Sequence, residues 1–320
     1  MDRTSWIALI ACFLLLIFYQ PILFFFFPEW AQPAPSSAPA SPGQSAEEVP
    51  SQVAPSASEA PRSPVVSGPV MQSGQEIIDP VPADVDEELT VLSNDFIDVA
   101  FTNLGGAIQW VSLKEHTALN GQPIILNEGS PLPILGLDGW GLGRSVFQVS
   151  EKSPTAVTYS REIQPGLVLE RRYEMLGDYR LECTQTVYHD GENIEVLAPF
   201  RLSLGTMASI YKRQEERRFV GMAWHTPEPG GSYEDKSMTS FDSGFLGFGG
   251  NKTELVSDSG ESIQWAALKT QFFALIVNMN DRPGLSLRGV PQRLPELKDP
   301  ETGIVPDGIR GTVELPGFQV

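Results

Sequence analysis

The pattern of apolar and polar positions divides the chain into three stretches, the first of which is almost wholly apolar. Trp6–Phe27 is a run of 22 residues whose only polar side chains are Tyr19 and Gln20. A helix of this length spans roughly 33 Å, enough to cross a hydrocarbon core of about 30 Å. We therefore predict an N-terminal transmembrane anchor over residues 1–30.

The charges beside this run predict its orientation. Arg3 precedes it and acidic Glu29 follows it, and basic residues favour the cytoplasmic side of a membrane. We expect a cytoplasmic N-terminus, with everything after residue 30 on the outer side of the membrane. A cleaved signal peptide is a weaker alternative, because the run is long and Phe24–Pro28 is a poor cleavage context. A lipoprotein site at Cys12 is weaker still, because the apolar run continues well past this cysteine.

The second stretch, residues 31–86, predicts a disordered linker. It is dominated by Pro, Ala, Ser, Glu and Val and has almost no aromatic residues. Such a segment buries too little apolar surface to offset the entropy of ordering it. Its prolines favour extended, semi-stiff conformations, which suit a tether.

The third stretch, residues 87–320, predicts a single mainly β domain. Short runs of alternating apolar and polar residues are separated by turn residues, at spacings of about ten residues and without intervening helix patterns. This arrangement predicts an antiparallel sandwich. We expect strands at Phe96–Phe101, Ala107–Leu113, Ala156–Arg161, Leu167–Met175, Tyr179–His189, Ile194–Leu204, Leu285–Leu287 and Thr312–Leu315.

Two segments of this domain are less regular. Residues 225–260 are rich in Gly, Ser and Asp, which predicts a long excursion with short strands. Its three phenylalanines are expected to cap the core rather than line a groove: Phe241, Phe245 and Phe248. Trp265–Ala274 fits either a helical turn or a strand, and the following Leu275–Val277 fits a strand.

The charge of the chain disfavours nucleic acid as a partner, and its two cysteines predict no internal disulfide. The chain carries 22 Lys and Arg against 40 Asp and Glu, a net charge of −18. Nucleic acid is therefore not expected as a partner, since phosphate binding needs clustered basic residues. If Cys12 lies in the bilayer it cannot reach Cys183, so we expect no internal disulfide.

No pattern in the chain specifies catalysis, a cofactor or a metal. His116, His189 and His225 stand in neither a triad nor a metal-binding spacing. The glycines of residues 244–250 lack the lysine and the strand–loop–helix context of a phosphate loop. The mixed-charge run Lys212–Arg218 predicts a solvated loop or helix end. We expect a protein that is not an enzyme, with no catalytic, cofactor-binding or metal-binding residues.

Four short motifs, in order, resemble the bacterial membrane protein insertases of the Oxa/Alb/YidC family. They are the opening Met1–Ile7, the hairpin Val99–Ile108 with its Gly-Gly turn, the strand Gly166–Tyr173, and the late segment Trp265–Phe273. The resemblance covers essentially the whole chain and matches the N-terminal half of the family. It implies a β-supersandwich, similar in shape to sugar mutarotase domains, in the periplasm at the inner membrane.

The resemblance also implies a role and partners. The family inserts and folds inner-membrane proteins, so the implied partners are nascent membrane proteins, inner-membrane lipid and Sec translocon subunits. In the family this work belongs to a later domain of five membrane helices. The present sequence has no second apolar run of 18 or more residues, so we expect that domain to be absent from this chain.

The alternative hypothesis is a membrane-tethered carbohydrate-binding or mutarotase-like β-sandwich. A mutarotase would need an acid and a base, such as Glu and His, facing one concave site. The few scattered histidines count against that chemistry. A binding module would use exposed aromatic residues, and four tryptophans are the candidates: Trp110, Trp140, Trp224 and Trp265.

Overall fold

The computed structural model describes most of the third stretch of the chain. The described residues are 86–118, 121–140, 142–189, 191, 195–210, 214–227, 232–242, 252–257 and 262–320. The predicted anchor (residues 1–30), residues 31–85 of the predicted linker, and Phe245 and Phe248 lie outside them. Across the described ranges, no helix is both long enough and apolar enough to span a membrane.

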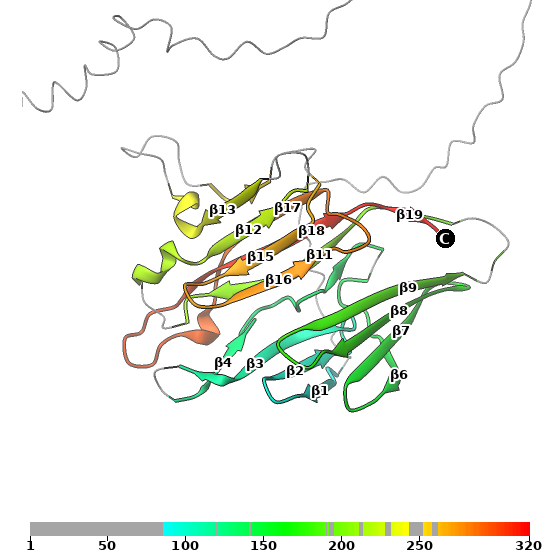
Figure 1. The fold of residues 1–320 in the computed structure, drawn as a ribbon, viewed down its shortest axis with the longest axis horizontal. Coiled ribbons are helices and arrows are strands. Elements are labelled where there is room, and N and C mark those ends of the chain that lie inside the picture. The colour runs from blue at the N-terminus through cyan, green and yellow to red at the C-terminus, as the bar shows by residue number, and fades with distance from the viewer. Residues whose placement is uncertain are drawn as a thin grey trace, which may run out of the picture. The chain divides into compact units, whose positions relative to one another are not determined.

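The N-terminal part of the domain consists of two four-stranded antiparallel sheets, with strand orders β1-β2-β3-β4 and β6-β7-β8-β9. They occupy the lower half of the view in Figure 1. Consecutive strands are neighbours throughout, as short hairpin connections require. The bounds are β1 Leu89–Ser93, β2 Ile97–Thr102, β3 Ala107–Thr117, β4 Pro123–Leu126, β6 Gln148–Lys152, β7 Ala156–Gln164, β8 Leu167–Met175 and β9 Leu181–His189.

The C-terminal part consists of a five-stranded sheet, a four-stranded sheet and a two-stranded pair, with orders β14-β17-β18-β11-β5, β13-β12-β15-β16 and β10-β19. The labelled strands of the two larger sheets lie in the upper half of Figure 1. The strand bounds are β5 Leu137–Asp138, β10 Val196–Leu197, β11 Phe200–Ala208, β12 Gly221–His225, β13 Tyr233–Ser237, β14 Leu255–Val256, β15 Trp265–Lys269, β16 Ala274–Asn278, β17 Ser286–Arg293, β18 Asp307–Leu315 and β19 Phe318–Gln319. The 3-10 helices are η2 Gln214–Arg218, η3 Met238–Phe241 and η5 Pro295–Leu297.

The predicted mainly β, antiparallel domain is confirmed, with corrections to individual strands. β8 has the predicted bounds Leu167–Met175. The strand predicted over Ile194–Leu204 is wrong as a single element, because Ala198 and Pro199 separate β10 from β11. A proline has no N–H to give to a sheet, so it ends the first strand. The ambiguous Trp265–Ala274 segment is strand β15 followed by a tight turn into β16.

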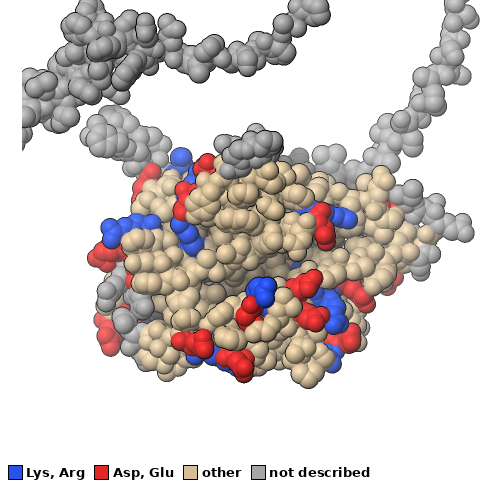
Figure 2. Space-filling model, viewed as in Figure 1, with Lys and Arg blue, Asp and Glu red and all other residues tan. Residues whose placement is uncertain are grey.

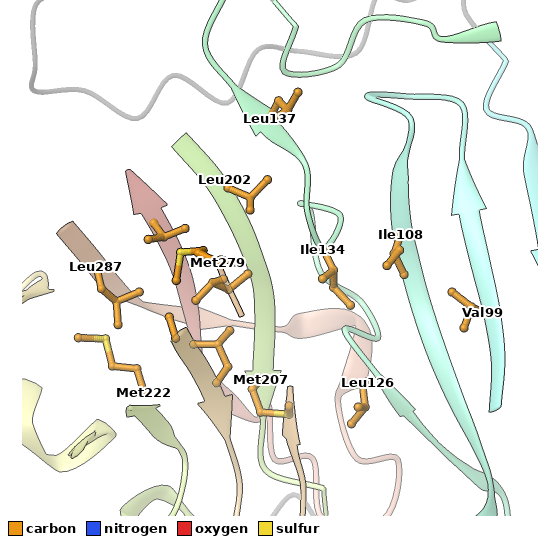
Figure 3. Packing of buried hydrophobic residues seen from close by; sticks show 14 of the residues in the cluster. Val99, Ile108, Leu126, Ile134, Leu137, Leu202, Met207, Met222, Met279 and Leu287 are labelled. Carbon is orange, nitrogen blue, oxygen red and sulfur yellow. The ribbon is translucent and has the colours of Figure 1, made fainter. Parts of the chain in front are cut away.

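One continuous cluster of buried side chains joins the sheets. Figure 3 shows Val99 and Ile108 of the first sheet facing Ile134, and Leu202 and Met207 of β11 continuing the cluster. Phe241 is buried in the same cluster, as predicted for a residue that caps the core. The described strands belong to one compact unit.

The Gly-Gly turn between β2 and β3 is held by side chains from β8. Gly105 and Gly106 have φ angles of +79° and +55°, which favour glycine. The buried Arg171 donates through Nη1 to the carbonyl of Gly105 at 2.6 Å and through Nη2 to the carbonyl of Leu135. The Tyr173 hydroxyl donates to the carbonyl of Gly106 at 2.8 Å. Two residues on one face of β8 therefore hold both glycine carbonyls of the turn.

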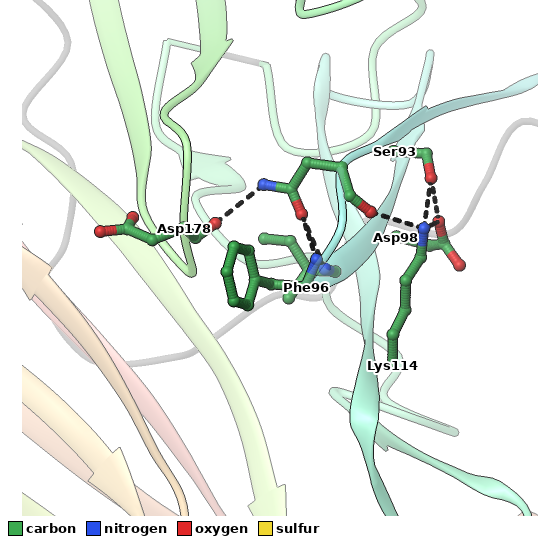
Figure 4. A network of polar contacts seen from close by, with 7 residues as sticks. Ser93, Phe96, Asp98, Lys114 and Asp178 are labelled. Carbon is green, nitrogen blue, oxygen red and sulfur yellow. Dashed lines mark hydrogen bonds and ion pairs between the residues drawn. The ribbon is translucent and has the colours of Figure 1, made fainter.

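A polar network joins the β1–β2 turn to the β8–β9 turn (Figure 4). Asn94 donates through Nδ2 to the carbonyl of Asp178 at 2.8 Å, and Lys114 lies 3.0 Å from the carboxylate of Asp98. Ser93 donates to the same carboxylate. Burial raises the pKa of Asp98, but the hydrogen bonds from Ser93 and Lys114 outweigh it, so this pKa lies below its ordinary value.

Candidate functional site

A shallow polar hollow of about 450 Å³ lies on the outer face of the β6–β9 sheet. Strands β7, β8 and β9 bring most of its lining together. The hollow is lined by Ser150, Glu151, Thr158, Glu170, Arg172, Thr184, Thr186 and Tyr188.

The alternation of β8 explains why these side chains share one face. Leu167, Leu169, Arg171 and Tyr173 are buried, whereas the residues between them are half-buried or exposed. Residues directly opposite one another in antiparallel strands point to the same side of a sheet. Thr158 pairs with Arg172 and Arg172 with Thr184, while Glu170 pairs with Thr186. The hollow is therefore a grid of hydroxyl, carboxylate and guanidinium groups.

The charged groups of the hollow are already partly paired. Arg172 lies 3.2 Å from the carboxylate of Glu151 and 3.5 Å from that of Glu174. A hydrogen bond to Glu170 raises the pKa of the Tyr188 hydroxyl. Thr158 is only 6% exposed, and its hydroxyl has no hydrogen-bond partner. The hollow thus combines one cation with two carboxylates and a row of hydroxyls.

This arrangement suits the binding of a polar neutral molecule. Carboxylates and guanidinium groups can exchange hydrogen bonds with vicinal hydroxyls. The Tyr188 side chain is 53% exposed and offers a ring face for stacking. The hollow has no histidine and no cysteine among its lining residues. The hollow was not predicted from the sequence, although the alternating polar positions of β8 and β9 carry a signal for it.

The structure does not bring the three histidines together. His116 lies near the end of β3, with Nε2 3.5 Å from the Tyr179 hydroxyl. His189 ends β9. His225 ends β12 and stacks on Trp265 with ring centroids 6.0 Å apart. In the described ranges, no three His, Cys, Asp or Glu side chains are grouped so as to hold a metal ion.

The four candidate tryptophans occupy different environments. Trp224 is 1% exposed and belongs to the core, so it is wrong as a candidate surface platform. Trp140 packs on Phe200 at 4.5 Å, and its Nε1 donates to a backbone carbonyl. Trp110 is half-buried in β3. Trp265 is half-buried beside His225 and the exposed Tyr233, and it is the tryptophan with a surface aromatic cluster around it.

The remaining candidate segments have structural partners. Arg217, in the mixed-charge run that the sequence assigns to a loop or helix end, lies in η2 and forms an ion pair with Asp242 at 2.6 Å. Cys183 lies on β9 directly opposite Tyr173. Burial raises the pKa of its thiol, with the Arg171 guanidinium pulling in the opposite direction. Such a thiol is a poor nucleophile at neutral pH.

Comparison with known proteins gives one sequence relative of note. No protein-family model matches the chain. The membrane protein insertase YidC of Porphyromonas gingivalis is 25% identical to it over 208 residues. The aligned region is 60% of this chain and 30% of the relative, so the chain spans about 30% of the length of that insertase.

Solved structures with a similar arrangement are β proteins of low sequence identity. A galactose mutarotase-like protein from Lactobacillus casei is 14% identical with a TM-score of 0.42, covering 73% of this chain and 95% of that one. A putative aldose 1-epimerase from Escherichia coli K12 is 9% identical with a TM-score of 0.39, covering 73% and 100%. A putative mutarotase from Salmonella typhimurium is 11% identical with a TM-score of 0.39, covering 73% and 86%. Matches at this level say nothing about activity.

Proposed function

We propose that this chain serves a YidC-type membrane protein insertase as its N-terminal portion. In this role a membrane anchor and a linker hold the β domain at the periplasmic face of the bacterial inner membrane. The similarity over 208 residues to an insertase carries the proposal. The apolar run Trp6–Phe27, long enough to span a bilayer, supports the membrane location.

In this proposal the β domain is not an enzyme, and its fold is a mutarotase-like supersandwich used for positioning. Its partners are nascent membrane proteins, inner-membrane lipid and Sec translocon subunits. The alternating burial of β8 and its backbone pairing with β7 and β9 support a rigid scaffold. The scattered positions of the histidines support a role without acid–base chemistry.

Insertion into membrane vesicles tests the proposal. Vesicles from cells with and without the full chain are supplied with a single-span membrane protein during its synthesis, and protease protection measures insertion. We expect removal of the chain to slow insertion several-fold and the full chain to restore it. A variant that keeps residues 1–86 but lacks 87–320 should fail to restore it. Export of a soluble secreted protein serves as the control.

Equal insertion rates with and without the chain would overturn the proposal. Restoration by residues 1–86 alone would show that the anchor acts without the β domain. A general loss of export, affecting the soluble control equally, would also contradict a role in membrane protein insertion.

The polar hollow on the β6–β9 sheet supports a second candidate function, the binding of a neutral carbohydrate. Its hydroxyls, carboxylates and single guanidinium can bond to sugar hydroxyls, and Tyr188 can stack on a sugar ring. Trp224 is unsuited to test this function, because its truncation would disturb the core. Tyr188→Ala is the informative change, with Tyr233→Ala as a control, since Tyr233 is an exposed tyrosine of another sheet.

A glycan-binding screen with the full chain decides this second candidate. A neutral glycan that binds the unaltered chain and the Tyr233→Ala variant, but binds Tyr188→Ala at least tenfold more weakly, would support it. Absence of binding to any glycan, or binding unaffected by Tyr188→Ala, would exclude the hollow as a carbohydrate site.

A further inference from the structure

Strand β16 is an edge strand whose outer hydrogen-bonding groups face away from the sheet. In the order β13-β12-β15-β16 it has a neighbour, β15, on one side. The backbone N–H of Met279 donates to Gln264 and that of Thr270 to Phe273, in the same register that pairs Leu268 with Leu275. Hydrogen-bonded pairs alternate along an antiparallel ladder. The N–H and C=O groups of alternate residues therefore point outward: Ala274, Ile276 and Asn278.

These outward-facing residues are also the exposed ones. Ile276 is 62% exposed, and Ala274 and Asn278 are exposed on either side of it. The intervening Leu275 and Val277 pack against the core instead. Phe272, in the preceding turn, is 56% exposed. Figure 2 shows uncharged surface where Figure 1 places β16. Among the described strands, the outer backbone groups of this edge have no partner, and the edge also presents the apolar side chain of Ile276.

This edge lacks the features by which proteins usually prevent strand pairing. Charges, prolines and bulges are the usual protections of an edge. Thr270–Asn280 contains no charged residue and no proline, and the β15–β16 register is regular.

Four of the other described edge strands of three or more residues carry such protections within the strand: charges in β13 and β9, charges and a bulge in β6, and a proline in β4. The fifth, β1, has none within the strand but directly follows Asp86, Glu87 and Glu88, whereas the first charge after β16 is Asp281. Two copies of a chain with a net charge of −18 repel one another over most of their surfaces. At β16 they can approach without placing like charges opposite each other.

We propose that β16 pairs with β16 of a second copy of this chain, antiparallel, across a two-fold axis through Ile276. The three outward residues are symmetric about this position. Ala274 would pair with the second copy's Asn278, Ile276 with Ile276, and Asn278 with Ala274, giving about six backbone hydrogen bonds. The two β13–β16 sheets become one continuous sheet, and the Ile276 side chains contact each other. An isologous contact of this kind closes on itself and forms a dimer, not a fibre.

The pairing is small and depends on tethering. A five-residue strand pair buries less surface than the roughly 1,200–2,000 Å² of a stable interface. We therefore expect the dimer in membranes, where anchored copies share one plane and a high effective concentration. The inference rests on the proposed membrane anchor but not on insertase activity, because its test detects proximity of two copies and no insertion step.

Cysteine cross-linking in membranes tests the register. The full chain with Cys12→Ser and Cys183→Ser is the background. Residues opposite each other in a hydrogen-bonded pair have Cα atoms about 5.5 Å apart, within disulfide range. Ile276→Cys should therefore cross-link to itself on mild oxidation. Ala274→Cys should not, because two copies of this residue lie roughly 13 Å apart along the paired strands.

A mixed sample provides the matched control. Membranes that contain both Ala274→Cys and Asn278→Cys chains should yield a disulfide between the two variants, although each variant alone gives at least tenfold less dimer than Ile276→Cys. Equal cross-linking of all single variants would indicate random collision and overturn the proposal. The proposal would also be overturned if the Ile276→Cys chain reacted with thiol reagents but did not dimerise. Cross-linking of Ile276→Cys to a different protein would overturn it too, because the edge would then bind a strand of another protein.

Discussion

Replacement of Arg171 by methionine removes the cation that holds the Gly-Gly turn, while keeping a long side chain in its place. Arg171 is fully buried, and its guanidinium donates to the carbonyls of Gly105 and Leu135. In the variant these two carbonyls lose their donor, at about 1–3 kcal/mol each. The variant also avoids burying a charge, which offsets part of this loss. We expect a net loss of about 2–4 kcal/mol in the free energy of unfolding.

The next residue of the same strand provides a matched control. Arg172 points to the outer face, where its side chain is 43% exposed and its partners are the exposed carboxylates of Glu151 and Glu174. Exposed ion pairs contribute little because water and salt screen them. Arg172→Met should therefore change the free energy of unfolding by no more than about 0.5 kcal/mol.

Urea unfolding of the full chain in a mild detergent, followed by near-ultraviolet circular dichroism, measures both variants under the same conditions. The linear dependence of the free energy on urea gives the difference between each variant and the unaltered chain. A cost for Arg171→Met below about 1 kcal/mol, or an equal cost for Arg172→Met, would refute the reasoning that the buried hydrogen bonds of the turn stabilise the domain.

Three further predictions test other contacts of the domain. The pKa of Asp98 is lower in the folded than in the unfolded chain. Ionised Asp98 therefore contributes its full stability above about pH 4, and this contribution is lost as the pH falls through the folded pKa. Asp98→Asn should flatten the fall in the free energy of unfolding at acid pH, as measured by urea unfolding at a series of pH values. Gly106→Ala places a methyl group 3.0 Å from the Tyr159 Cβ at a φ of +55°, so it should cost about 1–3 kcal/mol in thermal unfolding, whereas Gly121→Ala, with open space around it, should cost less. Trp224→Ala should cost about 3–5 kcal/mol in urea unfolding because the side chain is fully buried, and a loss below about 1 kcal/mol would contradict its place in the core.

Local sequence predicts the strands that alternate clearly and end at turn residues. β8 follows its prediction because Gly166 precedes it and Leu176 and Gly177 follow it, and because every second residue is buried. The β15–β16 hairpin was ambiguous for a physical reason. Its apolar run has no single period, and pairing with β12 on one side decides that it is a strand.

The contacts between distant segments could not be predicted from the sequence. Arg171 interrupts an apolar face, and its hydrogen bonds to the carbonyls of Gly105 and Leu135, 66 and 36 residues away, explain its place there. The polar hollow depends on the cross-strand register of β7, β8 and β9, which short motifs do not encode. The burial of Trp224 and the partial exposure of Trp265 likewise follow from the sheet that covers each residue, and not from its neighbours in the chain.

The contacts of β8 with the Gly-Gly turn impose an order of events during synthesis. The partners of the turn lie 66 and 67 residues further along the chain. At about 5–20 residues per second, the ribosome needs roughly 3–13 s to supply them after the turn has been made. During this interval the buried faces of β2 and β3 have no cover from β8, and their apolar side chains are open to wrong partners. The first sheet therefore needs protection of its apolar face until β8 has emerged from the ribosome.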